Sequence, residues 1–299
     1  MSELDIFDIE RFAIHDGEGI RTAVFFQGCP LKCKWCANPE SQSVGRKILF
    51  FGNKCVGCGG CAKACPRGVV SIINGKSVFD RAKCISCGKC AGICPRSAIK
   101  VSGRKISCEE LFEIVIRDKA YYDASSGGVT LSGGEALLQI DKLLPFLAKC
   151  KGAGVNIAFE TCGYVSVSSL FAADHFADSF LFDIKTLSAE KYKAYTGGEL
   201  EKYMYALDAL CRVSVNKITA RIPVIPQFND DEIPDILRFI ADNGIKEAHL
   251  LPYHTLGVEK YAALGREYEL KNIQALGAQE LEKYQPLGKE LGLKIKIGG

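Results

Sequence analysis

The sequence predicts an α/β fold: an open, partial (β/α)6 barrel that is interrupted by a small inserted domain. Short apolar runs alternate with longer segments of helical character, and a cysteine-rich repeat occupies residues 50–100. The chain of 299 residues, 47% hydrophobic and 24% charged, is long enough to bury one large core. We therefore expect the barrel at residues 1–49 and 101–299 and the insert at residues 50–100.

Six apolar runs are the candidate strands of the barrel. They lie at 21–26, 129–131, 156–159, 180–182, 218–222 and 248–251. The candidate helices lie at 107–119, 137–151, 199–212, 231–242 and 270–291. Strands and helices in alternation predict a parallel sheet. Six such units are too few for a closed eight-stranded barrel, so the sheet is expected to be open.

The first candidate strand leads into a CxxxCxxC loop. Cys29, Cys33 and Cys36 can hold three corners of a four-iron cluster, which leaves one iron open to a substrate or cosubstrate. Structural zinc, the alternative, usually takes four ligands, commonly as two separated pairs. Trp35 can pack on an adenine ring, although a lone tryptophan is more often part of a core. This spacing is similar to the signature of radical S-adenosylmethionine (SAM) enzymes.

Residues 50–100 contain two copies of the bacterial ferredoxin run. Each copy reads CxxCxxCxxxCP, and together they predict a ferredoxin-like domain with two [4Fe-4S] clusters. In such modules the last cysteine of each run binds the other cluster. The expected ligand sets are Cys55, Cys58, Cys61 and Cys94 for one cluster, and Cys84, Cys87, Cys90 and Cys65 for the other. Both clusters are closed, so we expect them to relay electrons or to shape a docking surface.

The remaining cysteines and the charge distribution set the protein class. Cys108, Cys150, Cys162 and Cys211 lie singly among apolar or helical residues, where a free cysteine usually behaves as a small buried hydrophobe. The clustered cysteines indicate metal binding in a reducing cytoplasm. A net charge of +3 without a basic tract predicts no nucleic-acid partner. No segment resembles a signal peptide or a membrane span.

Polar motifs stand where the predicted strands end, and the loops at these ends converge in barrels. Gly133 and Gly134 let backbone approach a ligand closely, and Glu135 offers an acceptor or a carboxylate that locks the fold. Alone, each motif has an ordinary structural role as a turn, a surface ion pair or a satisfied histidine; together they predict one site beside the cysteine loop. The motifs are Ser132-Gly133-Gly134-Glu135, Glu160-Thr161-Cys162-Gly163, Asp183-Ile184-Lys185, Arg221 and Tyr253-His254.

The side chains of these motifs divide into donors and oxygen ligands. Lys185 and Arg221 supply donors for a carboxylate or a ribose. His254 can donate to the same region of a ligand. Asp183 and Glu160 remain as oxygen ligands.

The combination resembles the glycyl radical enzyme activating enzymes, the radical SAM group that includes the pyruvate formate-lyase activating enzyme. The resemblance covers nearly the whole chain. Glu18 and Ala136 depart from it, because proline is expected at both positions; the change frees φ without removing a metal ligand. The matching segments are Ile14-His15-Asp16-Gly17-Glu18-Gly19-Ile20-Arg21-Thr22, the cysteine loop with Ala37-Asn38-Pro39-Glu40, the insert, Leu131-Ser132-Gly133-Gly134-Glu135, Asp183-Ile184-Lys185, Arg221-Ile222-Pro223 with Asn229-Asp230, and Leu251-Pro252-Tyr253-His254.

The resemblance implies a reaction and a set of contacts. A reduced cluster on the cysteine loop passes an electron to SAM, giving methionine and a 5′-deoxyadenosyl radical that takes hydrogen from a glycine of a partner enzyme. The implied SAM contacts are Trp35, Cys36 and Ala37 at the adenine, Gly134 at the methionyl amine, Asp183, Ile184 and Lys185 at the ribose and carboxylate, and His254 at the ribose. A monovalent cation near Glu160, Thr161 and Asp183 is also implied.

The resemblance implies protein partners as well. The insert, absent from the pyruvate formate-lyase activating enzyme itself, points to a glycyl radical lyase, dehydratase or decarboxylase. The electron donor is expected to be a low-potential flavodoxin or ferredoxin. Two alternatives stay open: a radical SAM enzyme acting on a small molecule or another peptide residue, and an iron-sulfur electron carrier.

Overall fold

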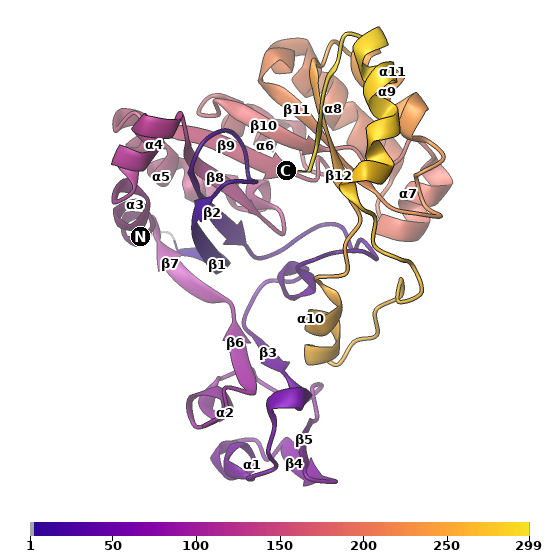
Figure 1. The fold of residues 1–299 in the computed structure, drawn as a ribbon. Helices are drawn as coiled ribbons and strands as arrows, with labels where there is room; N and C mark the ends of the chain where they lie inside the picture. Colours follow the sequence, from indigo (N-terminus) through magenta and orange to yellow (C-terminus); the bar gives the residue numbers. More distant parts are fainter. Residues whose placement is uncertain (1–2, 299) are drawn as a thin grey trace.

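A computed structural model describes residues 3–298 of the chain, and an open nine-stranded sheet forms its body (Figure 1). The strand order is β13-β12-β11-β10-β9-β8-β2-β1-β7. Neighbouring strands from β2 to β13 run parallel, whereas β1 pairs antiparallel with both β2 and β7. The expectation of an α/β fold built on an open, partial barrel is confirmed.

All six predicted strands are present, and three further strands extend the sheet at its edges. The predicted ones are β2 (Arg21–Phe26), β8 (Gly128–Gly133), β9 (Asn156–Thr161), β10 (Ser179–Asp183), β11 (Ile218–Val224) and β12 (Glu247–Pro252). The additional ones are β1 (Glu3–Ala13), β7 (Arg104–Ser107) and β13 (Lys294–Ile297). Buried parallel strands read as apolar runs, which is why the inner six were visible in the sequence.

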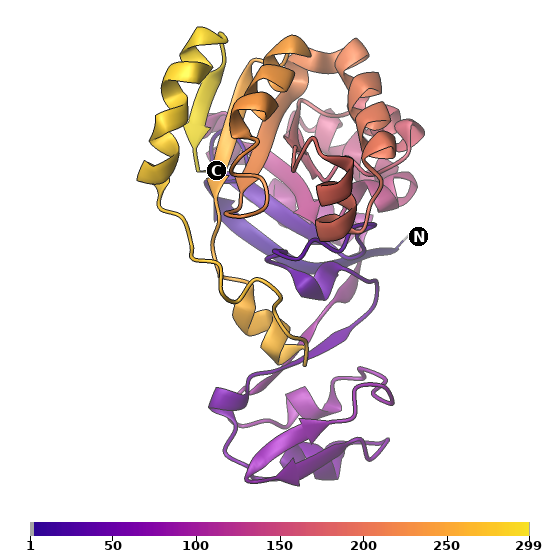
Figure 2. The same ribbon diagram turned by 90° about the vertical axis from the view of Figure 1, so that its right-hand side faces the viewer.

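Helices follow most of the parallel strands and cover the outside of the sheet (Figures 1 and 2). Four were predicted: α3 (Cys108–Ile116), α5 (Ile140–Gly152), α8 (Leu200–Ser214) and α9 (Ile233–Asp242). Four were not: α4 (Lys119–Ser125), α6 (Val167–Asp174), α7 (Ala189–Thr196) and α10 (Val258–Ala263). Short 3-10 turns lie at Pro39–Ser41, Gly52–Lys54, Ala136–Gln139 and Val215–Lys217.

The helix predicted at residues 270–291 is wrong in its first part. Helical structure covers only Ala278–Tyr284, as a 3-10 stretch, and α11 (Gln285–Glu290). Leu270, Ile273 and Leu276 have helical spacing, but they pack as part of an irregular segment against a cluster that contains Tyr253 and Tyr261. Burial of these side chains therefore produced the apolar period without a helix.

Residues 50–100 fall in a lobe below the sheet (Figure 2). It contains β4 (Val70–Ile73), β5 (Lys76–Phe79), α1 (Gly60–Ala64) and α2 (Lys89–Gly92). The stalk of the lobe is an antiparallel pair, β3 (Lys47–Phe50) with β6 (Ile99–Ser102), so the predicted boundaries lie inside these two strands. The lobe has an apolar cluster of its own around Ile48, Val70 and Ile99. Within residues 3–298, no helix is both long and apolar enough to cross a membrane.

Candidate active site

The CxxxCxxC loop leaves the end of β2 and is held by backbone hydrogen bonds. The amide of Lys32 donates to the carbonyl of Thr196, the last residue of α7, at 2.8 Å. The amide of Gly28 donates to the carbonyl of Ser41 at 2.7 Å and closes the base of the loop. Cys29, Cys33 and Cys36 are all partly buried. The loop is thus fixed at the C-terminal edge of the sheet, where the sequence predicted it.

Burial controls the thiols of this loop. It raises the pKa of Cys36 to about 11 and also raises the pKa of Cys33, whereas the nearby ammonium of Lys185 opposes both shifts. The Lys185 side chain is only 4% exposed, and its Nζ lies 2.6 Å from Oδ2 of Asp183. Metal binding displaces thiol protons and leaves thiolates. Lys185 is therefore placed to balance part of the charge that a cluster on this loop would bring.

The Gly133-Gly134 pair joins the end of β8 to the base of the cysteine loop. Gly133 has φ +104°, and a Cβ there would lie 2.3 Å from the amide nitrogen of Phe26. A Cβ on Gly134 would lie 2.3 Å from the carbonyl oxygen of Gly28. Only glycine fits at these positions. The close backbone approach that the sequence predicted is made here to the chain itself.

Glu135, the next residue, is fully buried. Its carboxylate accepts hydrogen bonds from Oγ1 of Thr161 at 2.9 Å, from the amide of Cys162 at 2.8 Å and from the amide of Leu137 at 3.2 Å. It therefore ties the end of β8 to the end of β9. Of the two roles considered from the sequence, this geometry fits the carboxylate that locks the fold.

Cys162 lies against the cysteine loop. Its thiol hydrogen-bonds to Cys29, which lowers the pKa of Cys29 and raises the pKa of Cys162. From the sequence, Cys162 was interpreted as a small buried hydrophobe. The one sequence feature that indicated a place near the site was its position at the end of a predicted strand. Cys150, by contrast, is fully buried in the apolar core, and Cys108 donates to the carbonyl of Lys142 at 3.2 Å.

Arg221 lies at the centre of a group of carboxylates inside the barrel. Its Nη1 is 3.2 Å from Oε1 of Glu160, which also accepts a short hydrogen bond from Ser132. Burial alone would lower the pKa of Arg221, but Glu160, Asp183 and Asp16 raise it overall. The sequence did not single out Asp16, although it belongs to a matching segment. In the described part of the chain, Nε of Arg221 is buried without any partner, whereas Nη1 has its ionic contact with Glu160 but no hydrogen bond.

The Asp183-Ile184-Lys185 segment is held by the neighbouring strand β11 and by the loop that follows it. The amide of Ile184 donates to the carbonyl of Arg221 at 2.7 Å. Asn229 is fully buried, and its Nδ2 donates to the carbonyl of Lys185 at 2.6 Å. The segment therefore cannot shift without moving the neighbouring strand β11.

Trp35 and the loop that carries His254 both lie next to the loop segment 36–37. Trp35 is partly buried and packs against Phe228, with ring centroids 4.7 Å apart. His254 is exposed in the loop after β12. Gly257 of that loop comes so close that an added Cβ would lie 2.8 Å from the carbonyl oxygen of residue 36. The structure thus brings the loop that carries His254 against the predicted adenine segment.

Comparison with known proteins gives full-length relatives. Residues 23–240 match the radical SAM superfamily. The choline trimethylamine-lyase activating enzyme of Oleidesulfovibrio alaskensis is 39% identical, covering 98% of this chain and 97% of its own length. The (2S)-3-sulfopropanediol sulfolyase activating enzyme of Bilophila wadsworthia is 41% identical, over 90% and 91%. The pyruvate formate-lyase 2-activating enzyme of Escherichia coli is 34% identical, over 98% and 92%.

The chain belongs to the glycyl radical enzyme activating enzymes of the radical SAM superfamily. Its class of reaction is that of an activase that installs a glycyl radical, and its partner is a glycyl radical enzyme. Membership also implies a [4Fe-4S] cluster and SAM. A solved domain of a pyruvate-formate lyase-activating enzyme from Bacteroides vulgatus is 23% identical, with a TM-score of 0.48, covering 58% of this chain and 99% of that one.

The residues of this activating enzyme fit SAM at the open side of the cysteine loop. The unpartnered Nε of Arg221, beside an Nη1 that has only an ionic contact with Glu160, suits an anionic group such as a carboxylate. A buried donor that stays unpaired costs about 1–3 kcal/mol, so a ligand that pairs it is favoured. Lys185 and Asp183 already pair with each other, and their oxygen and nitrogen atoms can share a polar ligand.

The cysteines of the insert line two separate small cavities. Cys55, Cys58, Cys61 and Cys94 line one cavity, and Cys65, Cys84, Cys87 and Cys90 line the other. This is the same division that the sequence predicted from the crossing fourth cysteine. Gly59 and Gly88, at φ +75° and +84°, precede the short helices α1 and α2 in the two halves.

No three His, Cys, Asp or Glu side chains between residues 3 and 298 converge where a single metal ion would sit. A four-iron cluster does not need such convergence, because each thiolate binds a different iron. The three cysteine groups are therefore candidates for iron-sulfur clusters and not for mononuclear sites.

Proposed function

We propose that this enzyme generates its radical at the cysteine loop and delivers it to a glycine of a partner lyase, dehydratase or decarboxylase. The observation that carries the proposal is the occurrence of a three-cysteine loop together with Arg221, whose buried Nε lacks a partner and whose Nη1 has only an ionic contact with Glu160. An electron carrier needs neither feature. A closed cluster in the insert alone would serve that function.

The SAM contacts follow from the site. Arg221 would receive the carboxylate of SAM, and Lys185 with Asp183 would hold the ribose and carboxylate region. Trp35, with one side against Phe228, offers a rigid apolar wall to the adenine. His254 would close the ribose side from the loop after β12. When bound, the cluster and SAM together supply a carbon-centred radical, and the protein supplies position and electrostatics.

A monovalent cation would suit the carboxylates beside Arg221. Glu160 and Asp183 are both close enough to raise the pKa of Arg221, and the side chain of Glu160 is largely buried. Burial, with the charges of Asp183 and Asp16, raises the pKa of Glu160, and Arg221 and the hydrogen bond from Ser132 oppose the shift. The hydroxyl of Thr161, at the end of β9, already donates to Glu135, so the carboxylates of Glu160 and Asp183 are the main oxygen ligands for the cation. A cation here would reduce the mutual repulsion of the carboxylates.

Two closed clusters in the insert, in addition to the open one, bring the proposed total to three. Their role would be to pass electrons from a flavodoxin or ferredoxin toward the cysteine loop. Among named relatives, the partner enzymes include lyases, a dehydratase and decarboxylases. This range defines the panel of partners for the test.

The test is anaerobic reconstitution with iron and sulfide, followed by SAM, dithionite and each candidate partner. We expect 5′-deoxyadenosine from the enzyme and a glycyl doublet in the electron paramagnetic resonance spectrum of one partner. The lack of any 5′-deoxyadenosine from fully loaded protein would reject the proposal. Steady 5′-deoxyadenosine formation that consumes a small molecule, with no doublet on any partner, would favour the other radical SAM function.

A further inference from the structure

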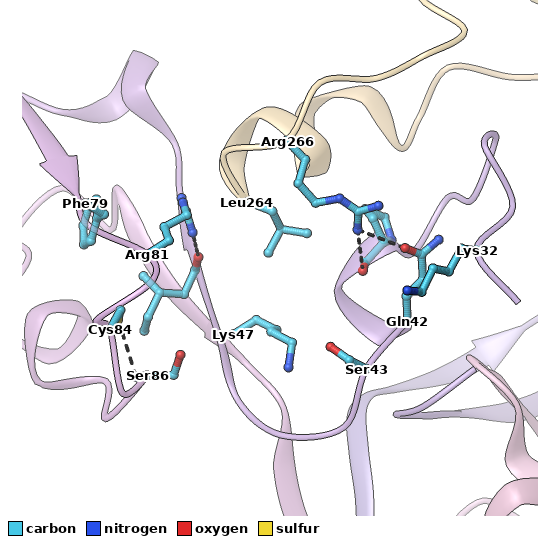
Figure 3. A pocket seen from close by; sticks show the side chains of 12 residues that line it. Lys32, Gln42, Ser43, Lys47, Phe79, Arg81, Cys84, Ser86, Leu264 and Arg266 are labelled. Carbon is cyan, nitrogen blue, oxygen red and sulfur yellow. Dashed lines mark hydrogen bonds between the residues drawn. The ribbon is translucent and has the colours of Figure 1, made fainter. Parts of the chain in front are cut away.

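A cavity of about 370 Å³ lies between the insert, the loop after Cys36 and the C-terminal segment (Figure 3). Figure 3 shows Lys47 between Arg81 and Cys84 on the insert side and Gln42 on the loop side. Lys32, from within the CxxxCxxC loop, also lines it. The cavity therefore borders both the predicted open cluster and the insert.

The wall of this cavity is cationic. Lys32, Lys47, Arg81 and Arg266 line it, and no Asp or Glu does. Among the described residues none of these four takes part in a salt bridge. Lys47 donates to the carbonyls of Val44 and Gly45, Arg81 to those of Ile48 and Ala263, and Arg266 to Oε1 of Gln42. Burial lowers the pKa of Lys47 and of Arg81, and only the thiol of Cys84 opposes this shift, at Arg81. An anionic partner would supply the missing counter-charge.

The charge asymmetry extends over the whole insert. Residues 50–100 hold nine Lys or Arg and one Asp, a net +8, whereas the whole chain has +3 and the remainder is therefore −5. Two oxidised clusters, each with four thiolates, would still leave the insert at about +4. A field of this sign attracts an acidic surface and raises its rate of association.

The cavity also lies next to a predicted redox centre. Cys84 and Ser86 line both this cavity and the small cavity of the second cysteine set, and the amide of Ser86 donates to Sγ of Cys84 at 3.4 Å. Electron transfer slows steeply with distance, so a carrier docked here has short paths to this cluster and, past Lys32, to the cysteine loop. A nucleic acid would have no use for a binding site close to a redox centre, so this location favours an electron carrier.

We propose that this cavity is the docking site of an acidic, low-potential electron carrier protein, with Lys47, Arg81 and Arg266 receiving carboxylates of the carrier. The proposal rests on the proposed function, because it is the reduction of the cysteine-loop cluster that the carrier supports. One electron leaves the carrier and enters a cluster of the enzyme; no bond forms or breaks.

The test is stopped-flow reduction of the reconstituted, full-length enzyme by a reduced acidic ferredoxin at low salt. Lys47→Glu should lower the rate of cluster reduction about tenfold, since it reverses a charge in the wall. Lys289→Glu, the same charge change on α11 at the far end of the molecule, should change it less than about twofold. Lys47→Gln should give an intermediate rate and serves if the reversal disturbs folding. At about 0.5 M NaCl the rates of cluster reduction of the wild type and the three variants should become similar, because salt screens the charges.

The controls separate this proposal from the proposed function. Dithionite bypasses the carrier, so Lys47→Glu should form 5′-deoxyadenosine with dithionite at the wild-type rate. Equal ferredoxin rates in Lys47→Glu, Lys47→Gln and Lys289→Glu would overturn the docking site. Competition by duplex DNA as strong as by the carrier would also overturn it, in favour of a nucleic-acid surface. Loss of dithionite-driven product from the wild type would instead reject the proposed function.

Discussion

At the scale of single residues, Glu135 and Arg221 show two different uses of a buried charge. Glu135 has its oxygens taken up by three donors of the chain, so it holds β8 and β9 together. Arg221 keeps its buried Nε without a partner among the described residues, and its Nη1 has only an ionic contact with Glu160. Because an unpaired buried donor is costly, a fully paired charge indicates structure and a partly paired one indicates a ligand.

Arg221→Gln should weaken SAM binding about tenfold or more, because a charge-assisted hydrogen bond to a carboxylate contributes about 1.5–3 kcal/mol. Isothermal titration of the reconstituted enzyme measures the Kd, and iron analysis checks that the cluster is retained. Arg238→Gln is the matched control, since Arg238 is half-exposed on α9 and pairs only with Asp235. An unchanged Kd in Arg221→Gln would contradict the role given to its incompletely paired guanidinium group.

Glu135→Gln should lower the free energy of unfolding by about 2 kcal/mol. The glutamine NH2 group would replace a carboxylate oxygen and would face hydrogen-bond donors of the chain that this oxygen now accepts from. We expect a Tm lower by about 5 °C in thermal unfolding of the reconstituted enzyme. Glu113→Gln, on the exposed side of α3, should leave the Tm unchanged. If Glu135 instead bound SAM, the variant would lose affinity while keeping its Tm.

At the scale of elements, buried strands could be predicted from the sequence, whereas strands with an exposed face could not. The six inner strands are apolar runs, and each was recognised. β1 begins with charged residues at alternate positions, Glu3 and Asp5, and a register shift after Ile6 interrupts the alternation before Asp8; at this end only one of its faces is buried. β13 has four residues, two of them lysine. The missed helices α6, α7 and α10 have eight residues or fewer, too short for a clear helical period.

Gly134→Ala should detach the end of β8 from the cysteine loop, since its Cβ would meet the carbonyl oxygen of Gly28 at 2.3 Å. We expect about four fewer irons per chain after reconstitution, with the insert still loaded. Gly152→Ala is the control, because a Cβ at the end of α5 has nothing within 4 Å. Full iron content in Gly134→Ala would show that the loop tolerates the displacement.

At the scale of the whole molecule, spacing predicted which motifs gather but not how they touch. The motifs lie at strand ends, and the parallel sheet brings such ends together whatever the side chains do. The contact of Cys162 with Cys29, and the place of Asp16 near Arg221, join segments that are more than 100 residues apart. These contacts depend on sheet register and rotamers, which a single sequence does not contain. The cationic cavity between insert and barrel is a further case.

The proposed division of work between the two lobes gives the last prediction. The double variant Cys58→Ala/Cys87→Ala should keep the cysteine-loop cluster, because both changes lie within the insert. The insert joins the body through the β3–β6 stalk and through contacts such as Arg81 with Ala263, which the changes leave in place. With dithionite it should cleave SAM, but with a ferredoxin it should form less than about a tenth of the glycyl radical, because closed clusters can only relay electrons.

Cys108→Ala is the matched cysteine control, since Cys108 lies on α3 outside both cavities of the insert. The yield of the glycyl doublet with each reductant is the measurement. Equal yields with ferredoxin in the double variant and the wild type would mean that electrons reach the cysteine loop directly. A carrier docked at the cationic cavity would then pass electrons to the cysteine loop past Lys32, and the insert would act as a docking surface without a relay.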